Sequence, residues 1–187
     1  GKQGIHSALE TLLQNPGWSA GESHAGALFS LNHEMGSLTL EPGCQIELSA
    51  TPNSSLFELE ETIAAYLQEI MLLGESHDID FFGIGLNPLV PAKDIPLLPK
   101  YRYELMDNLF QRTGKLGQYM MRNSASLQVC IDYFSEEDLL AKLNLSFQLC
   151  PFVRALFSNS PFMDGVKSEF KCMRGLVWQN TDPDRQG

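Results

Sequence analysis

Three stretches of the chain repeat apolar residues with the 3.6-residue period of an amphipathic helix. They run from Ile5 to Gln14, from Ser55 to about His77, and from Tyr101 to Arg112. In each stretch the apolar side chains would share one face. Ser55 is followed three positions later by Glu58, and this S-x-x-E pattern is the capping box typical of a helix start. The pattern therefore predicts three helices, of which the second is the longest.

A further long helix is predicted in the second half of the chain. It begins after Ser135, which three acidic residues follow directly, and it runs to about Phe157. Pro151 lies inside it and is expected to kink it. The tail after Phe157 is rich in Gly, Asp and Asn, and a short ordered stretch is expected at Met173 to Trp178.

Other segments alternate apolar and polar residues as strands do. Gly36 to Ala50 predicts two strands, with Pro42-Gly43 as the turn between them. Ala125 to Tyr133 alternates over nine residues, Ala27 to Leu31 could be a short strand, and Asp80 to Leu86 is a short apolar run that predicts a buried strand. Since the strands are polar on one face, we expect an α+β fold with an antiparallel sheet packed on helices, and not a doubly wound parallel fold.

The segment from Asn87 to Lys100 contains four prolines. No long helix or central strand tolerates that density, so an ordered loop is expected. Loops of this length inside compact domains are often functional.

Composition narrows the class of protein. The 187 residues are 43% hydrophobic, which is enough for a sizeable core, and the formal net charge is -10. An acidic surface repels phosphate backbones, which argues against a general nucleic-acid binder. No apolar run reaches the roughly 18 residues that a membrane span needs. We therefore expect neither nucleic acid nor a membrane among the partners.

Polar side chains on the predicted strand faces are the first candidate chemistry. Glu41, Gln45 and Glu47 lie on one strand pair, and Gln128 and Asp132 lie on another strand. Carboxylate and amide oxygens in such places suit a hard cation such as Mg²⁺. The alternative is that this face of a half-exposed sheet is polar because it meets water.

Other motifs carry less information. Gly83-x-Gly85 has neither the GKS/GKT continuation of a P-loop nor the third Gly of a dinucleotide fingerprint. The four Cys are far apart and the four His lack metal-ligand spacing, so a zinc site is not expected. Near the end of the chain, Arg174 and Arg185 could grip a carboxylate or phosphate, and Trp178 could wall an apolar pocket.

Several blocks together resemble one enzyme family. In chain order they are SLTLEPGCQIELSATP, FFGIGLNP, KDIPLLPKYRYELM, GQYMMRNSASLQVCIDY, ALFSNSPFMDG and MRGLVWQNTDPDRQG. They resemble the glutamate–cysteine ligases of plants and proteobacteria, nearly continuously from Gly36 to Gly187. The MM-x-x-x-AS-x-QV run is closer still to the related actinobacterial enzyme that feeds ergothioneine synthesis.

The resemblance implies a fold and a reaction. The fold would be that of the glutamine-synthetase-like catalytic domain, a curved antiparallel sheet around the site with helices on its outer side. The reaction would be ATP-dependent joining of the γ-carboxylate of L-glutamate to the amine of L-cysteine through a γ-glutamyl phosphate. It is the first step of glutathione or related thiol biosynthesis, and it needs Mg²⁺ on the nucleotide phosphates.

The resemblance also implies roles for individual residues. Glu41 and Glu47 match acidic strand positions that bind Mg²⁺, and Gln128 would complete a metal or nucleotide contact. Arg174 and Arg185 would serve catalysis by holding the α-carboxylate or phosphate of a substrate. The remaining substrate contacts expected are Trp178, as a wall of the cysteine pocket, and Ser49, on the same strand face as Glu47.

Two departures from the family pattern matter. The plant enzymes have an Arg where this chain has Asn123, with Arg122 one position earlier. Since adjacent side chains of a strand face opposite ways, Arg122 could not simply replace it on a regular strand. The plant-type Asn after Gln-Val is Cys130 here, and Cys is a poorer hydrogen-bond partner.

The resemblance further implies that family members are longer than this chain. Residues 1–187 are therefore expected to be an internal portion of a single catalytic domain, incomplete and inactive by itself. A cytoplasmic or plastid location is expected, and a homodimer is a possible assembly. Two alternatives stay open: another ATP-dependent carboxylate–amine ligase of the same superfamily, or a non-catalytic relic or interaction module.

Overall fold

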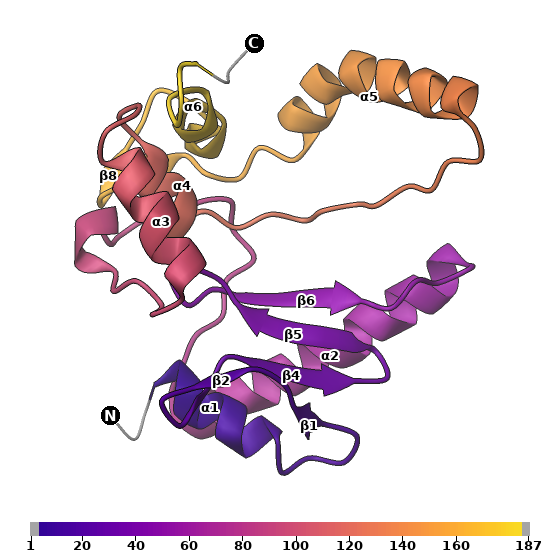
Figure 1. The fold of residues 1–187 in the computed structure, drawn as a ribbon, viewed down its shortest axis with the longest axis vertical. Helices are drawn as coiled ribbons and strands as arrows, with labels where there is room; N and C mark the ends of the chain where they lie inside the picture. Colours follow the sequence, from indigo (N-terminus) through magenta and orange to yellow (C-terminus); the bar gives the residue numbers. More distant parts are fainter. Residues whose placement is uncertain (1–3, 185–187) are drawn as a thin grey trace. The chain divides into compact units, whose positions relative to one another are not determined.

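The computed structural model describes residues 4–184. The chain divides into two compact units, drawn together as a ribbon in Figure 1. The first unit comprises residues 1–82 and 97–104, and the second comprises residues 83–96 and 105–187. Each unit is described by itself below.

The first unit is built on a four-stranded antiparallel sheet. Its strands are β1 (Ser19–Ala20), β4 (Ser30–His33), β5 (Gly36–Leu40) and β6 (Ile46–Ala50), and they lie side by side in that order. A small separate hairpin consists of β2 (Ser23–His24) and β3 (Ala27–Leu28). The predicted strand pair around Pro42-Gly43 is confirmed as β5 and β6. The predicted strand at Ala27 to Leu31 is instead divided between β3 and the start of β4.

The register of the sheet separates an apolar face from a polar face. Leu31, Leu38 and Leu48 lie opposite one another across three strands, and Leu31 and Leu38 are fully buried. Thr39 and Glu47 form the next pair along β5 and β6, so their side chains take the other face. The expected alternation is therefore present in the structure.

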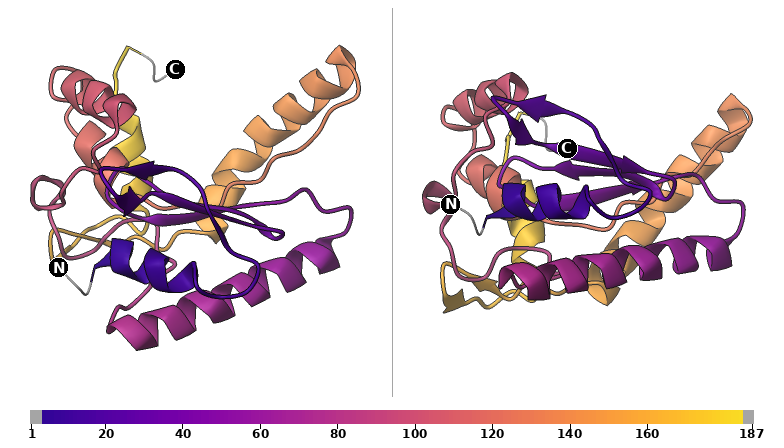
Figure 2. Two further views of the ribbon diagram at one scale, coloured as in Figure 1. Left: turned by 60° about the horizontal axis from the view of Figure 1, so that its bottom comes forward. Right: turned by 90° about the horizontal axis from the view of Figure 1, so that it is seen from below.

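Two helices cover the apolar face, α1 (Ile5–Leu12) and α2 (Leu56–His77) (Figure 2). Both contribute buried side chains, among them Leu9 and Leu12 of α1 and Ile70 and Leu73 of α2. The oxygen of Ser55 accepts a hydrogen bond from the Phe57 N–H at 3.1 Å, which confirms Ser55 as the N-cap. The reciprocal half of the capping box is absent, because the Glu58 carboxylate accepts from the Ser54 hydroxyl instead.

The second unit is mainly helical. Its helices are α4 (Gly117–Asn123), α5 (Glu136–Leu156), α6 (Met173–Gln179) and the later part of α3 (Tyr101–Phe110), which begins in the first unit. The predicted loop before α3 contains one short 3₁₀ helix, η1 (Ala92–Asp94), and a hairpin of β7 (Phe162–Met163) and β8 (Val166–Lys167) precedes α6. Leu86, Met173 and Val177 form the buried centre of this unit. All four helices predicted here and in the first unit, and the ordered stretch near Met173, are confirmed.

Two predicted strands are wrong. Asp80 to Leu86 and Ala125 to Tyr133 are irregular, apart from an isolated bridge between Leu86 and Ser124. Leu127 is 79% exposed and Val129 is 76% exposed, and Gln128 and Cys130 on the opposite face are exposed too, so neither face of the second segment is covered. A strand exists only by pairing with a neighbour. The alternation in these sequences is suited to a strand, but the described residues provide no neighbour.

The α5 helix is equally uncovered. Its Ser135 hydroxyl oxygen accepts the Asp138 N–H, which confirms the predicted start, yet none of its 21 residues is buried. The class is α+β with antiparallel sheets, as expected. Within residues 4–184, none of the helices combines the length and the apolar character needed to cross a membrane.

Candidate functional site

The polar end of β5 and β6 brings two carboxylates together. Glu47 lies on β6 opposite Thr39, and Glu41 directly follows β5. The Glu41 N–H donates to the Gln45 carbonyl at 2.9 Å, which closes the connection between the strands. Within this turn Cys44 has a φ of 65°, in the left-handed region. Two local features, the strand pairing and the turn, therefore place both carboxylates on one face of the sheet.

The electrostatics show that these carboxylates interact. Burial raises the pKa of Glu41, and the negative charge of Glu47 raises it further, while Arg102 and Lys100 act in the opposite direction. A nearby like charge disfavours ionisation, and a bound cation would remove that penalty. The Glu47 charge also contributes to the pKa of Tyr66, which burial in the first place raises to about 12.

The donor set fits Mg²⁺ as an incomplete site. Within residues 4–184, no three His, Cys, Asp or Glu side chains are grouped so that they could share a metal ion. Mg²⁺ is commonly bound through one or two carboxylates together with water and substrate phosphates, and two carboxylates are what this face provides. Glu41 and Glu47 are therefore the residues of this chain that could hold the ion.

A basic and aromatic segment, for which no role was predicted, lies beside Glu41. The Leu98 N–H donates to the Pro42 carbonyl at 2.8 Å, and the Tyr103 hydroxyl lies 3.4 Å from the Leu40 carbonyl. These contacts fix residues 98–103 against the end of β5. The only sequence signal was the alternation of basic and aromatic residues in PKYRY, which lies within one of the family-like blocks.

This segment borders a cavity of ≈ 450 Å³ in the first unit. Lys100 Nζ forms an ion pair with Glu22 at 2.7 Å and lies 5.5 Å from the centroid of the Phe29 ring. The lining residues are Glu22, His24, Phe29, Pro99, Lys100, Tyr101, Arg102 and Tyr103. The cavity thus offers cations, one carboxylate and aromatic walls to a polar ligand.

In the second unit, Arg174 and Trp178 lie together on α6. The guanidinium carbon of Arg174 is 5.5 Å from the Trp178 ring centroid, which is cation–π range. The Arg174 N–H donates to the hydroxyl oxygen of Ser160 at 3.1 Å, and Ser160 is only 2% exposed. Ser160 therefore caps the first turn of α6 from outside the helix and fixes the position of Arg174.

Among residues 4–184, no carboxylate is paired with the positive charge of the Arg174 side chain. No ion pair involves it within the described residues, and its buried Nε has no hydrogen-bond acceptor. Burial lowers the pKa of this guanidinium, which nevertheless stays protonated because Arg titrates far above neutrality. A half-buried, unpaired Arg suits the carboxylate or phosphate of a ligand.

Of the remaining candidate site residues, some lie on the predicted element and others do not. Ser49 is exposed and pairs with Ser37 on the sheet, on the same face as Glu47. Gln128 lies in the unpaired exposed segment, so the prediction of a regular strand face for it and for Asp132 is wrong. Arg185 lies outside the described residues. The structure thus groups Glu41 with Glu47, and Arg174 with Trp178.

Arg122 and Asn123 are on helix α4, so the argument from strand geometry about them is wrong. Arg122 Nη2 bonds the Asp107 carboxylate at 2.7 Å, with side chains only 11% and 13% exposed. Its Nη1 also donates to the Ile95 carbonyl at 3.0 Å. Asn123 is buried and donates to the Val90 carbonyl at 2.6 Å. Both side chains are used to fix the proline-rich loop.

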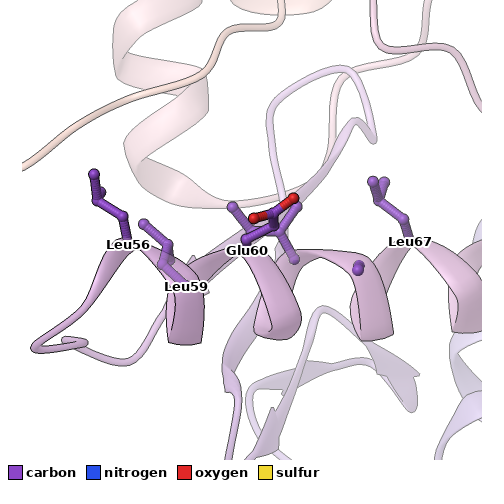
Figure 3. A pocket seen from close by; sticks show the side chains of 6 residues that line it. Leu56, Leu59, Glu60 and Leu67 are labelled. Atoms are coloured by element: carbon purple, nitrogen blue, oxygen red, sulfur yellow. The ribbon is translucent and has the colours of Figure 1, made fainter.

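A second hollow lies along α2 and carries little chemistry (Figure 3). Its volume is ≈ 380 Å³, and it is lined by Leu56, Leu59, Glu60, Ile63, Ala64 and Leu67. Glu60 is the only ionisable group among these lining residues. The carboxylate pair and the arginine–tryptophan pair are therefore better candidates for a catalytic role.

Comparison with known proteins points in one direction. The family model described as Glutamate-cysteine ligase family 2 (GCS2) matches residues 1–187. A chloroplastic glutamate–cysteine ligase of Medicago truncatula is 40% identical over 151 residues, which are 81% of this chain and 30% of that protein. The corresponding enzyme of Arabidopsis thaliana is 39% identical over 81% of this chain and 29% of its own length. Glutamate–cysteine ligase A of Oryza sativa subsp. indica is 38% identical, again over 81% of this chain, and over 31% of its own length. The chain thus spans only about a third of the curated relatives that it matches.

Proposed function

The chain belongs to glutamate-cysteine ligase family 2, and from that premise we propose that it is part of an ATP-dependent glutamate–cysteine ligase. The product would be γ-glutamylcysteine, the precursor of glutathione or a related thiol. The observation that carries the proposal is the carboxylate pair Glu41 and Glu47 on one sheet face, beside the cations Lys100 and Arg102.

The reaction has two balanced steps. A γ-carboxylate oxygen of L-glutamate attacks the γ-phosphorus of ATP, and the bond to the leaving ADP breaks. The amine of L-cysteine then attacks the carbonyl carbon of the γ-glutamyl phosphate, inorganic phosphate leaves, and the amine nitrogen loses a proton. Positioning and charge stabilisation supply most of the rate in phosphoryl transfer.

The residues of this chain fit these needs. Glu41 and Glu47 would hold Mg²⁺, which neutralises charge on the phosphates when it is bound. Lys100 and Arg102 add positive charge at the same end of the sheet, where they already act on Glu41. These groups are held in place by β5, β6 and residues 98–103, which bond the end of β5, and such positioning would favour catalysis.

Substrate contacts complete the assignment. Arg174 would bind the α-carboxylate or phosphate group of a substrate. Trp178 would line the cysteine pocket, since the Arg174 guanidinium carbon lies 5.5 Å from its ring centroid. Ser49 would contact substrate from the Glu47 face, and Gln128 would add a metal or nucleotide contact. Arg185 is proposed to act with Arg174 in catalysis.

The architecture of the whole enzyme is also proposed. Residues 1–187 would be an internal portion of a single glutamine-synthetase-like domain, whose curved sheet is completed by other sequence. Three features support this: the chain spans about 30% of the length of its relatives, residues 125–133 have no strand partner in the described part of the chain, and α5 buries no residue. The 187 residues alone would be inactive, and the complete enzyme could form a homodimer. The chloroplastic names of the plant relatives support a plastid over a cytoplasmic location.

Substrate requirements test the proposal. The complete protein is incubated with ATP, Mg²⁺ and glutamate, with cysteine or with a panel of other amines, and phosphate and product are measured. We expect phosphate release and γ-glutamylcysteine only when cysteine is present. Equal use of another amine without cysteine activity would indicate a sister carboxylate–amine ligase, and no turnover with any amine would indicate a non-catalytic relic.

A further inference from the structure

An amide side chain, that of Asn159, lies against the same backbone segment as the Arg174 side chain. Asn159 belongs to the segment between α5 and β7, outside both groups of residues already discussed. Its Oδ1 accepts the Gly85 N–H at 3.0 Å, and its Nδ2 lies 3.4 Å from the Gly83 carbonyl. The oxygen and the nitrogen of this amide therefore both bond the backbone of residues 83–85, which we call the Gly83–Gly85 strip.

Arg174 lies against the same strip. A Cβ atom on Gly85 would meet Asn159 Oδ1 at 2.8 Å and Arg174 Cδ at 3.3 Å. The first distance is shorter than real Cβ contacts allow, and the second leaves almost no room. The absent Cβ of Gly85 is thus what lets both the amide and the arginine side chain lie against the backbone of Gly85.

The charge of Arg174 is left unused by this arrangement. Its Nε is buried without an acceptor, and no carboxylate pairs with it in the described part of the chain. The neighbours that the structure shows around it are the Asn159 amide, the Ser160 hydroxyl, the Trp178 ring and the Cys172 thiol. None of these groups is a carboxylate. An aspartate is nearly isosteric with asparagine and would supply the missing anion.

We propose that Asn159 is a positioning and specificity-determining residue, whose neutral amide fixes the Gly83–Gly85 strip under Arg174 and leaves the guanidinium for an anionic oxygen group of a substrate. The identity of that substrate rests on the proposed ligase function, whereas the requirement for a neutral side chain at residue 159 does not. The group is a carboxylate or a phosphate, and the chemistry of Arg174 is suited to either.

The test compares two substitutions in the complete protein. Asn159→Asp keeps the Oδ1 acceptor for Gly85 but adds a competing anion, whereas Asn159→Leu removes both hydrogen bonds without adding charge. We expect Asn159→Asp to weaken the binding of one substrate by about tenfold or more. The reason is that a carboxylate of the protein would compete with that substrate for the charge-assisted hydrogen bonds of Arg174. Asn159→Asp loses the Nδ2 bond to the Gly83 carbonyl and should melt below the wild type. Asn159→Leu, which loses both bonds, should melt lower still but weaken the binding of the same substrate less.

A matched control separates local from general effects of charge. Asn180 is at the other end of α6, and its Nδ2 donates to the Leu176 carbonyl at 2.9 Å. The Asn180→Asp variant makes the same chemical change away from Gly85, and its KM values should equal those of the wild type. The KM of Asn159→Asp for each substrate shows which anionic group Arg174 binds. A higher KM for glutamate or for cysteine alone indicates a carboxylate, and a higher KM for ATP indicates a phosphate.

Direct binding keeps the inference separate from the proposed function. If the wild-type protein makes no γ-glutamylcysteine, the ligase proposal fails, but calorimetric binding of glutamate, cysteine and ATP still compares wild type with Asn159→Asp. Weaker binding of one of these ligands by that variant supports the inference. Unchanged binding of all three would overturn it, and so would an Asn159→Leu variant that loses as much affinity as Asn159→Asp.

Discussion

Replacing Asp107 with Ala should destabilise the protein by about 3–5 kcal/mol, because it leaves a buried guanidinium without its carboxylate. The Arg122 side chain is 11% exposed and that of Asp107 is 13% exposed, so water replaces little of the lost interaction. The ion pair is 2.7 Å long, and the Asp107 carboxylate also accepts a weaker bond from Gln118 at 3.3 Å. The Arg122 Nε already lacks an acceptor, so the variant would leave two sides of a buried cation unpaired.

Urea unfolding of the complete protein measures this effect, with an exposed ion pair as the control. Lys142 and Asp138 are 2.7 Å apart on α5, with side chains 35% and 30% exposed. Because exposed pairs contribute little, Lys142→Ala should destabilise the protein far less than Asp107→Ala does. A loss of less than about 1 kcal/mol for Asp107→Ala would refute the reasoning, since a buried pair cannot be broken so easily.

A paired substitution extends the test to function. Replacing Arg122 with Met and Asp107 with Leu together removes both charges, and apolar pairs of similar volume often restore stability. The double variant should be more stable than Asp107→Ala and should keep the wild-type KM for glutamate, because Arg122 is used to fix the loop carbonyls of Ala92 and Ile95. A raised KM for glutamate in a stably folded double variant would show that Arg122 contacts substrate.

Three further predictions concern the carboxylate pair, the α6 cap and a tyrosine. Glu47→Gln should raise the Mg²⁺ concentration needed for half-maximal activity at least tenfold (about 1.4 kcal/mol), whereas Glu60→Gln, at an exposed position on α2, should leave it unchanged. Ser160→Ala should cost about 1 kcal/mol in thermal unfolding, as the loss of a helix cap does, and an unchanged melting temperature would contradict the capping role. Burial and the hydrogen bond to Asp164 raise the pKa of Tyr119 from 10.0 to about 12, so Asp164→Asn should lower it when the tyrosinate absorbance is titrated. Because the folded pKa is the higher one, the stability from protonated Tyr119 is present below pH 10 and is lost as the pH rises toward 12.

Local signals were sufficient for α1, α2, α3 and α5 and for one strand pair, but not for α4, whose residues Arg122 and Asn123 were expected to lie on a strand. Ser55 and Ser135 begin their helices because the serine oxygen accepts an N–H of the first turn, and that contact lies within four residues of sequence. The strands on either side of Pro42-Gly43 are joined by a short connection, so their pairing is also local. The polar face carrying Glu41 and Glu47 followed directly from their alternation.

Non-local contacts account for what the sequence could not predict. Residues 125–133 have the alternation of a strand, but pairing depends on a neighbour that no local pattern specifies. The partner of Arg122 lies 15 residues away on another helix, and Asn159 bonds a strip 74 residues away. Lys100 and Arg102 approach Glu41 only because the backbone at Leu98 bonds the turn at Pro42.

The most direct test of the ligase account follows one oxygen atom. The complete protein is incubated with ATP, Mg²⁺, cysteine and glutamate that carries heavy oxygen in its γ-carboxylate, and the released phosphate is analysed by mass spectrometry. Because the γ-glutamyl phosphate breaks at the carbonyl carbon, we predict one heavy oxygen in each phosphate, together with equal amounts of γ-glutamylcysteine. Phosphate without the heavy oxygen, or labelled phosphate without γ-glutamylcysteine, would contradict the account.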